Sequence, residues 1–171
     1  TNDIAMALRT PTREAEDIKC KYGCALSQLA DPEDILEVAG VDDRPSRKLS
    51  RRALADVIQP RVEELFELIQ NELRRAGFED VLSSGIVITG GASVMPGMVE
   101  LGEEIFHMPV RQGLPKYTGS LADVVQNPRF STAYGLLLEA QTQRKRGQKI
   151  TETRNMKDVM SSMKAWFAKN F

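Results

Sequence analysis

Residues 85–97 read GIVITGGASVMPG, and this stretch decides the fold. Gly85–Thr89 is a short apolar run, the pattern of a strand that is buried on both faces. It meets Gly90 and Gly91, and a helix is expected from about Pro96 to Phe106. Glycines between a strand and a helix N-terminus let a ligand approach the backbone N–H groups, although many α/β proteins turn at such a pair without binding anything.

The flanking sequence predicts helices and short strands in alternation. A helix is expected to begin at Thr10-Pro11, with Thr10 as its N-cap, and to end at Gly23. The further elements expected are a hairpin of two extended segments at 35–39 and 46–49, a long helix at 51–76, a strand at 110–112 and a helix from 131 to about 143. Strand, glycine turn, helix, strand and helix in this order indicate an α/β protein.

The composition is typical of a globular protein, with 171 residues, 42% of them hydrophobic, and a net charge of −1. No stretch approaches the roughly 20 apolar residues that a membrane-spanning helix needs. Cys20 and Cys24 have no further cysteine or histidine nearby, so we interpret them as reduced thiols and predict no metal site. The lone His107 is assigned a structural role, and no catalytic residue is predicted.

Basic and acidic side chains are distributed unevenly along the chain. Residues 144–171 hold eight basic and two acidic side chains, a net charge of +6, whereas the rest of the chain carries −7. An acidic body with a basic tail indicates an anionic partner for the tail, either a membrane surface or nucleic acid.

The last sixteen residues, MKDVMSSMKAWFAKNF, form an amphipathic helix at 100° per residue. Its apolar stripe consists of Met156, Val159, Met160, Met163, Trp166, Phe167 and Phe171, with Lys157 and Lys164 at the edge of the stripe. Bulky apolar residues with lysines at the margin are typical of a helix that lies in a membrane interface. We therefore predict binding to anionic membrane lipids, after a polar linker at 143–155.

Other uses of this segment remain open. It could dock on its own domain as an ordinary C-terminal helix, or fill a calmodulin-like groove on a partner. Nucleic acid is the weakest alternative, because basic and aromatic residues are segregated here rather than interleaved, and we predict no nucleic-acid partner.

Three motifs carry a resemblance to a known family. The pattern [IV]xxTGGxSxxPG begins at Ile86, TPxxEAExIKxxYG begins at Thr10, and RFSTAYGLL begins at Arg129. With the amphipathic tail, they resemble the FtsA family of bacterial cell-division proteins, within the actin-like ATPase superfamily. The resemblance implies an α/β fold: the second lobe of the actin-like (ribonuclease H-like) fold, its N-terminal lobe absent, with a C-terminal amphipathic helix.

The resemblance also implies a division of the chain. In order, it predicts the end of an inner-subdomain helix at 1–11, an outer subdomain at 12–77, the distal half of the inner subdomain with the adenosine motif at 78–142, the linker at 143–155 and the membrane helix at 156–171.

The implied cofactor is ATP, bound on its adenosine side by Gly90, Gly91, Ala92 and Ser93, with Glu16 and Lys19 reaching the ribose and base. The two acidic, glycine-rich phosphate loops of the superfamily are not found in this sequence. Magnesium is therefore expected to be held by the missing N-terminal part, and the chain alone is not expected to be an enzyme.

The resemblance implies a function as an adaptor that anchors the FtsZ ring to the membrane and helps to assemble the division machinery. The partners implied are the FtsZ C-terminal tail, other copies of the protein in filaments, anionic lipids and later division proteins. Arg51, Arg52 and Arg61 are the residues expected to contact the acidic FtsZ tail. The location implied is the cytoplasmic face of the inner membrane, peripherally bound at the septum. The alternatives are an actin-like pilus-assembly or shape-determining protein, or a fragment of an actin-fold sugar kinase.

Overall fold

The computed structural model describes residues 1–40, 45–78, 81–82 and 84–146. The membrane-helix prediction at 156–171 and most of the linker lie outside these residues. The chain divides into two units, Thr1–Ser131 and Thr132–Phe171. The first unit contains nearly all of the elements, and the described part of the second is one helix.

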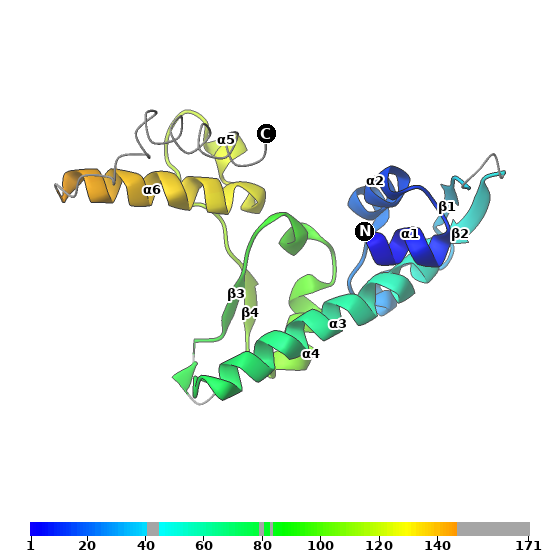
Figure 1. Cartoon of the computed structure of the whole chain (residues 1–171), viewed down its shortest axis with the longest axis horizontal. Coiled ribbons are helices and arrows are strands. Elements are labelled where there is room, and N and C mark those ends of the chain that lie inside the picture. Colours follow the sequence, from blue (N-terminus) through cyan, green and yellow to red (C-terminus); the bar gives the residue numbers. More distant parts are fainter. Residues whose placement is uncertain (41–44, 79–80, 83, 147–171) are drawn as a thin grey trace, which may run out of the picture. The chain divides into compact units, whose positions relative to one another are not determined.

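Helices and short strands are interspersed along the chain (Figure 1). The helices are α1 (Asn2–Leu8), α2 (Thr12–Tyr22), α3 (Arg51–Arg75), α4 (Met98–Phe106), α5 (Ala122–Val125) and α6 (Ser131–Lys145), and the 3-10 turns are η1 (Ser27–Leu29), η3 (Gly91–Val94) and η4 (Pro128–Phe130). The strands are β1 (Ile35–Val38), β2 (Arg47–Ser50), β3 (Ile86–Ile88) and β4 (Val110–Gln112). The predicted hairpin is confirmed, because β1 and β2 pair antiparallel with Ile35 opposite Ser50.

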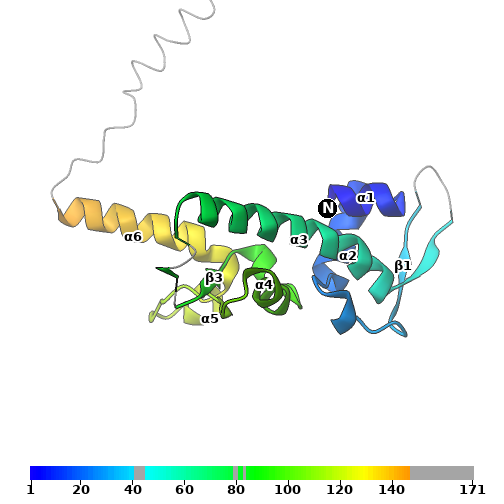
Figure 2. The same ribbon diagram turned by 90° about the horizontal axis from the view of Figure 1, so that it is seen from below.

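Helix α3 connects two hydrophobic clusters. It begins where Ser50 caps it, the Ser50 hydroxyl accepting a hydrogen bond of 3.2 Å from the backbone N of Ala53. Its N-terminal half packs against α1, α2 and the hairpin, while its C-terminal half packs against α4 and β4 (Figures 1 and 2). Val62, near the middle of the helix, contacts both clusters.

The first cluster holds α2 in place. Its buried members are Ile4 and Leu8 of α1, Ala15 and Ile18 of α2, Leu36 and Val38 of β1, and Leu54 and Ile58 of α3. Burying a side chain of this size contributes about 1.5–3 kcal/mol. Because α2 supplies two buried residues to this cluster, its opposite face is fixed in orientation and turned outward.

The second cluster supports the strand and helix that follow the glycine pair. Phe66 of α3 packs against Phe106 of α4, with ring centroids 5.2 Å apart, and Leu101 and Val110 are buried beside them. Strands β3 and β4 are parallel, with Ile86 opposite Val110, and α4 connects them. This is the predicted strand–turn–helix–strand arrangement, with η3 placed between the glycines and the helix.

The prediction that the GIVIT strand is buried on both faces is wrong for this chain. Val87 at its centre is 49% exposed, and Ile86 and Ile88 are only partly buried. Among the described residues, β3 pairs with β4 alone in a sheet of two strands. A two-stranded sheet leaves one face uncovered, so an apolar strand sequence does not by itself produce burial.

The predicted N-cap of α2 is also wrong. Pro11 occupies the N-cap position, and Thr10 is 4% exposed with a hydroxyl that has no hydrogen-bond partner among the described residues. Gly23 ends the helix as predicted, but in an extended rather than a left-handed conformation. A Cβ at Gly23 would lie 2.4 Å from the Lys19 carbonyl oxygen, which is why glycine is needed there. In the described part of the chain, no helix combines the length and apolar character needed to cross a bilayer.

Candidate functional site

A cleft of about 400 Å³ opens between the exposed face of α2 and the segment that follows the glycine pair. Its lining residues are Glu16, Lys19, Cys20, Lys21 and Gly23 of α2 and its end, Gly91, Ala92, Val94, Met95 and Pro96 of the segment that begins with η3, and Arg51 and Arg129. Four residues predicted to bind adenosine, Glu16, Lys19, Gly91 and Ala92, therefore meet in one cavity. We refer to this cavity as the cleft.

The helical period explains four of the five cleft residues that α2 and its end supply, and Lys21 is the exception. Glu16, Lys19, Cys20 and Gly23 are spaced by three or four residues and share one face. The buried residues Ala15 and Ile18 belong to the other side of the helix and anchor it in the first cluster. Cys20 and Gly23 could have been found from Glu16 by this spacing alone, although neither was predicted as a site residue.

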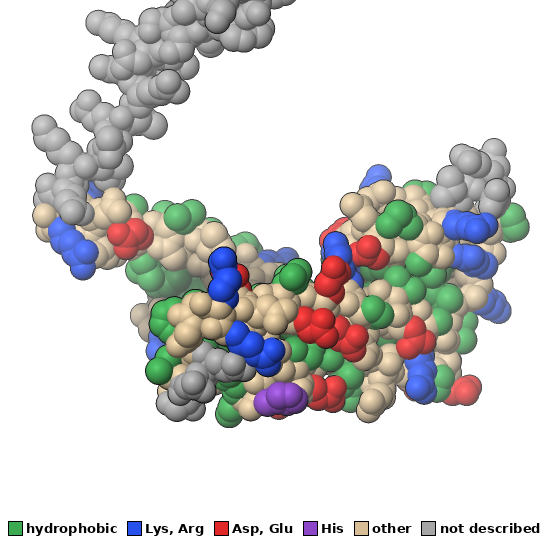
Figure 3. Space-filling view, turned by 60° about the horizontal axis from the view of Figure 1, so that its bottom comes forward, with side chains coloured by type: hydrophobic (Ala, Val, Ile, Leu, Met, Phe, Trp, Pro, Cys, Tyr) green, Lys and Arg blue, Asp and Glu red, His purple; other side chains and the backbone are tan. Residues whose placement is uncertain are grey.

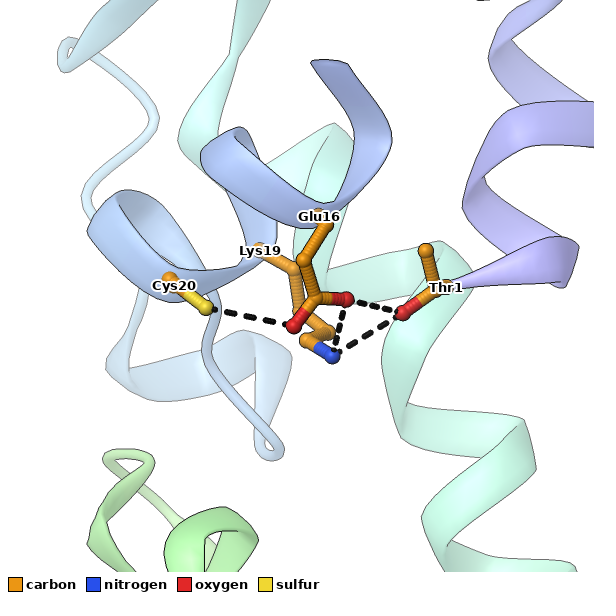
Figure 4. Close-up of polar contacts among 4 residues, drawn as sticks. All are labelled: Thr1, Glu16, Lys19 and Cys20. Atoms are coloured by element: carbon orange, nitrogen blue, oxygen red, sulfur yellow. Dashed lines mark hydrogen bonds and ion pairs between the residues drawn. The ribbon is translucent and has the colours of Figure 1, made fainter. Parts of the chain in front are cut away.

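Four side chains form a hydrogen-bond network at one end of the cleft (Figure 4). Lys19 Nζ lies 2.6 Å from Glu16 Oε2 and donates a second hydrogen bond of 2.9 Å to Thr1 Oγ1. The Thr1 hydroxyl also donates to Glu16 Oε2, and Cys20 Sγ lies 3.5 Å from Glu16 Oε1. Thr1 precedes α1, so the network joins two helices.

The network keeps Glu16 ionised. Hydrogen bonds from Lys19 first, and then from Thr1, lower the pKa of the Glu16 carboxyl from 4.5 to about 2. Partial burial, and next the hydrogen bond to Glu16, raise the pKa of the Cys20 thiol. The cleft thus presents a carboxylate, which accepts hydrogen bonds, and a protonated thiol beside it.

The glycine pair shapes the opposite wall. Gly90 has a φ of 97°, a conformation that residues with a side chain disfavour. The Ser93 hydroxyl donates a hydrogen bond of 2.8 Å to the carbonyl oxygen of Gly90. Ser93 is buried, and its own carbonyl accepts a hydrogen bond of 2.6 Å from Gln112 Nε2. Of the predicted residues, Gly90 and Ser93 therefore form the turn without lining the cleft, whereas Gly91 and Ala92 line it.

Basic side chains outnumber acidic ones around the cleft. Arg51 donates a hydrogen bond of 3.0 Å from Nε to the carbonyl of Tyr22 and lies 3.8 Å from Asp34. Lys21 and Arg129 have no ion pair within the described residues. Glu16, the one acidic lining residue, is already paired with Lys19, so the cleft favours an anionic ligand.

The three arginines predicted to contact a partner do not form one site. Arg51 lines the cleft, whereas Arg61 pairs with Asp3 at 3.5 Å and Glu64 at 2.5 Å. Arg52 is exposed, and Arg61 follows it by nine positions, which sets the two side chains on opposite sides of α3. Basic side chains also gather beside the β1–β2 hairpin (Figure 3), where Arg47 and Lys48 are exposed.

Comparison with known proteins identifies the family. The family described as "Cell division protein FtsA" matches residues 1–135. Over the whole chain, the sequence is 50% identical to the cell division protein FtsA of Pseudomonas aeruginosa, 41% to that of Neisseria meningitidis and 39% to that of Escherichia coli K12. In each case the chain spans 43% of the relative's length.

The fold agrees with this assignment. The structure of MreB 5 of Spiroplasma citri bound to AMPPNP superposes with a TM-score of 0.67 at 16% identity, covering 85% of this chain and 43% of that one. The same protein bound to ADP gives a TM-score of 0.53 at 18% identity, over 81% of this chain and 44% of that one. The fold is that of one lobe of an actin-like protein, as predicted. The chain belongs to the FtsA family of cell division proteins.

Proposed function

We propose that this protein is an ATP-binding cell-division adaptor that anchors the FtsZ ring to the cytoplasmic face of the inner membrane at the septum. Membership of the FtsA family supports a role in cell division over the pilus-assembly, shape-determining and sugar-kinase alternatives. The observation that carries the nucleotide part is the cleft, in which Glu16 and Lys19 of α2 meet Gly91 and Ala92 of the opposite wall.

The cleft has the properties that an adenosine group requires. Its volume of about 400 Å³ falls within the range of small-molecule sites, about 300–1,000 Å³. Glu16 would accept hydrogen bonds from ribose hydroxyls, and Gly91 would let the nucleotide approach the backbone closely. The excess of basic side chains suits a phosphate-bearing ligand.

The rest of the ATP site would be formed by parts of the full-length FtsA relatives that lie outside this chain. The phosphate loops and the magnesium ligands would come from there, so the chain by itself would not hydrolyse ATP. The actin-like protein MreB 5, whose fold resembles this chain, binds AMPPNP and ADP in its solved structures, which supports nucleotide binding here. In this proposal ATP controls self-association into filaments rather than a chemical transformation.

Nucleotide binding is tested in the full-length protein, which is this chain extended to the length of its relatives. A fluorescent ATP analogue is titrated into the wild type, Glu16→Gln and Asp17→Asn. Asp17 is exposed on the same helix and does not line the cleft, so it is the matched control. Weaker binding in Glu16→Gln alone supports the proposal, and equal binding in all three proteins refutes this site.

The membrane part of the proposal rests on the amphipathic pattern at 156–171, which lies outside the described residues. A single short interfacial helix binds lipid weakly, and stable anchoring usually takes two signals. Several copies on one filament would supply the missing strength through avidity. A weak anchor on a self-associating body is therefore physically consistent with an adaptor that also recruits later division proteins.

Sedimentation with anionic liposomes tests the anchor. The wild type is compared with a version that ends at Asn155 and with Trp166→Glu. Binding by the wild type alone, with a blue shift of Trp166 emission, supports membrane attachment. If all three proteins stay in the supernatant at low salt, the membrane part of the proposal is withdrawn.

The FtsZ part of the proposal rests on basic side chains of the outer subdomain. The three arginines predicted to contact an acidic tail peptide, Arg51, Arg52 and Arg61, do not lie in one site, so one of them would bind the peptide, because a single guanidinium group binds a carboxylate through a pair of hydrogen bonds. Arg52 has the strongest claim, since it is exposed and has no ion pair among the described residues, whereas the other two have acidic partners. Titration of an FtsZ tail peptide should show weaker binding to Arg52→Ala than to Arg13→Ala, an exposed control on α2. Equal binding to both variants would remove Arg52 from the contact.

A further inference from the structure

The Thr1 side chain contacts the carboxylate of the cleft from a different helix. Thr1 directly precedes Asn2, the first described residue of α1, and its hydroxyl makes no hydrogen bond to the backbone of that helix. Instead it donates to Glu16 Oε2 on α2 and accepts a hydrogen bond of 2.9 Å from Lys19 Nζ (Figure 4). The hydroxyl is therefore engaged on both its donor and its acceptor side by α2.

The two carboxylate oxygens of Glu16 accept different numbers and strengths of hydrogen bonds. Oε2 accepts from both Thr1 and Lys19, the second at 2.6 Å, and so has little capacity left. Oε1 has only the long contact of 3.5 Å from the weakly donating Cys20 thiol. A hydroxyl donor entering the cleft would thus find one carboxylate oxygen that accepts only this weak contact and is held at a defined position.

The network removes freedom that Glu16 would otherwise have. Its side chain is 48% exposed, and an exposed glutamate samples many rotamers. Two donors on one oxygen restrict it to one arrangement before a ligand arrives, and such preorganisation raises affinity by lowering the entropic cost of binding. The lowered pKa of Glu16 is consistent with this arrangement, because both donors favour the charged form.

We propose that Thr1 is a positioning residue of the nucleotide site, which, together with Lys19, holds Oε2 of Glu16 so that Oε1 is left to accept a hydrogen bond from a ribose hydroxyl. This inference rests on the proposed nucleotide function and extends it to α1. Lys19 then acts mainly on Glu16 and less on the ligand, since two of its three N–H donors are used inside the network.

The test compares ATP with 2′-deoxy-ATP and 3′-deoxy-ATP in the full-length protein. The wild type should bind one deoxy analogue more weakly than ATP, because Glu16 loses its hydroxyl partner. Thr1→Val, which keeps the shape and loses the hydroxyl, should bind ATP about three- to tenfold more weakly. It should bind the sensitive analogue nearly as the wild type does. Thr1→Ser, which keeps the hydroxyl, should behave like the wild type.

A double-mutant cycle separates positioning from a general loss of structure. If Thr1 acts through Glu16, Thr1→Val adds little to Glu16→Gln, and the two effects are not additive. Equal losses for ATP and both analogues, or additive effects, would overturn the positioning role. If Glu16→Gln weakens ATP binding and Thr1→Val does not, only this inference fails. If the wild type binds no ATP, the proposed nucleotide function fails with it.

Discussion

The guanidinium of Arg51 donates a hydrogen bond of 3.0 Å from Nε to the carbonyl oxygen of Tyr22, the last residue of α2. The last carbonyls of a helix lack partners within it, and arginine is a favourable donor to them. Arg51 also starts α3, so its side chain links the end of one helix to the beginning of the next. This contact lies in the wall of the cleft.

We therefore expect Arg51→Ala to act on the nucleotide site. Loss of the hydrogen bond, worth about 1 kcal/mol, loosens the last turn of α2 and should lower ATP affinity by up to about fivefold. Arg52→Ala, at the neighbouring exposed position, should leave ATP affinity unchanged. Fluorescence titration of ATP into both variants measures the difference, and equal affinities would show that Arg51 has no part in the cleft.

Two glycines near the cleft should respond differently to alanine. At Gly90 a Cβ would meet nothing within 4 Å, so Gly90→Ala adds only the backbone strain of a φ of 97° with a ψ of 173°, about 1–3 kcal/mol. At Gly97 the φ is 84° and a Cβ would lie 2.6 Å from the backbone N of Leu26. Gly97→Ala should therefore lower the free energy of unfolding further, by more than about 3 kcal/mol, because backbone must move. Urea unfolding of the full-length protein measures the free energy of unfolding of both variants. If Gly97→Ala is as stable as Gly90→Ala, the prediction is contradicted.

Much of the fold could be predicted from local patterns. The long helix from Arg51, the hairpin and the order strand, glycine turn, helix and strand each follow from periodicity and turn residues. The exposure of Val87 could not be predicted, because burial of a strand depends on neighbours that its own sequence does not specify. The prediction of Thr10 as the N-cap of α2 was wrong for a related reason. Packing, rather than a local capping preference, determines the position of Thr10 and keeps it buried.

The candidate site also contains residues that the sequence predicted and residues that it did not. Glu16, Lys19, Gly91 and Ala92 were predicted by resemblance and line one cleft. Arg129 was not predicted, since it comes from a segment more than a hundred residues after α2 and reaches the cleft only through the fold. Arg51 was predicted for a different role, because its charge suggested a peptide contact and nothing in the sequence indicated the carbonyl of Tyr22.

The core contact between α3 and α4 provides a stability test. Phe66 is 3% exposed and packs against the ring of Phe106, so Phe66→Ala should lower the free energy of unfolding by about 3–5 kcal/mol. Leu68, two residues along the same helix, is 61% exposed, and Leu68→Ala should change it by less than about 0.5 kcal/mol. Both values come from urea unfolding. A small effect of Phe66→Ala would mean that the second cluster contributes little to stability.

The Glu16 network predicts a specific dependence of stability on pH. Because its pKa is lowered from 4.5 to about 2, ionised Glu16 stabilises the folded state fully above about pH 4.5. This contribution is lost as the pH falls from about 4.5 to about 2, since the unfolded state then binds the proton first. Its size is limited by solvent screening, because the side chain is 48% exposed.

The measurement is the difference in melting temperature between the wild type and Glu16→Gln as a function of pH. The difference should be constant from neutral pH to about pH 5 and should shrink below that, as the carboxylate takes up a proton. In a background of Thr1→Val and Lys19→Met, which removes both donors to Oε2, the same comparison should lose most of its pH dependence in this window. A pH dependence that persists in this background would mean that other groups lower the pKa of Glu16, and the network would then not be what keeps the carboxylate charged.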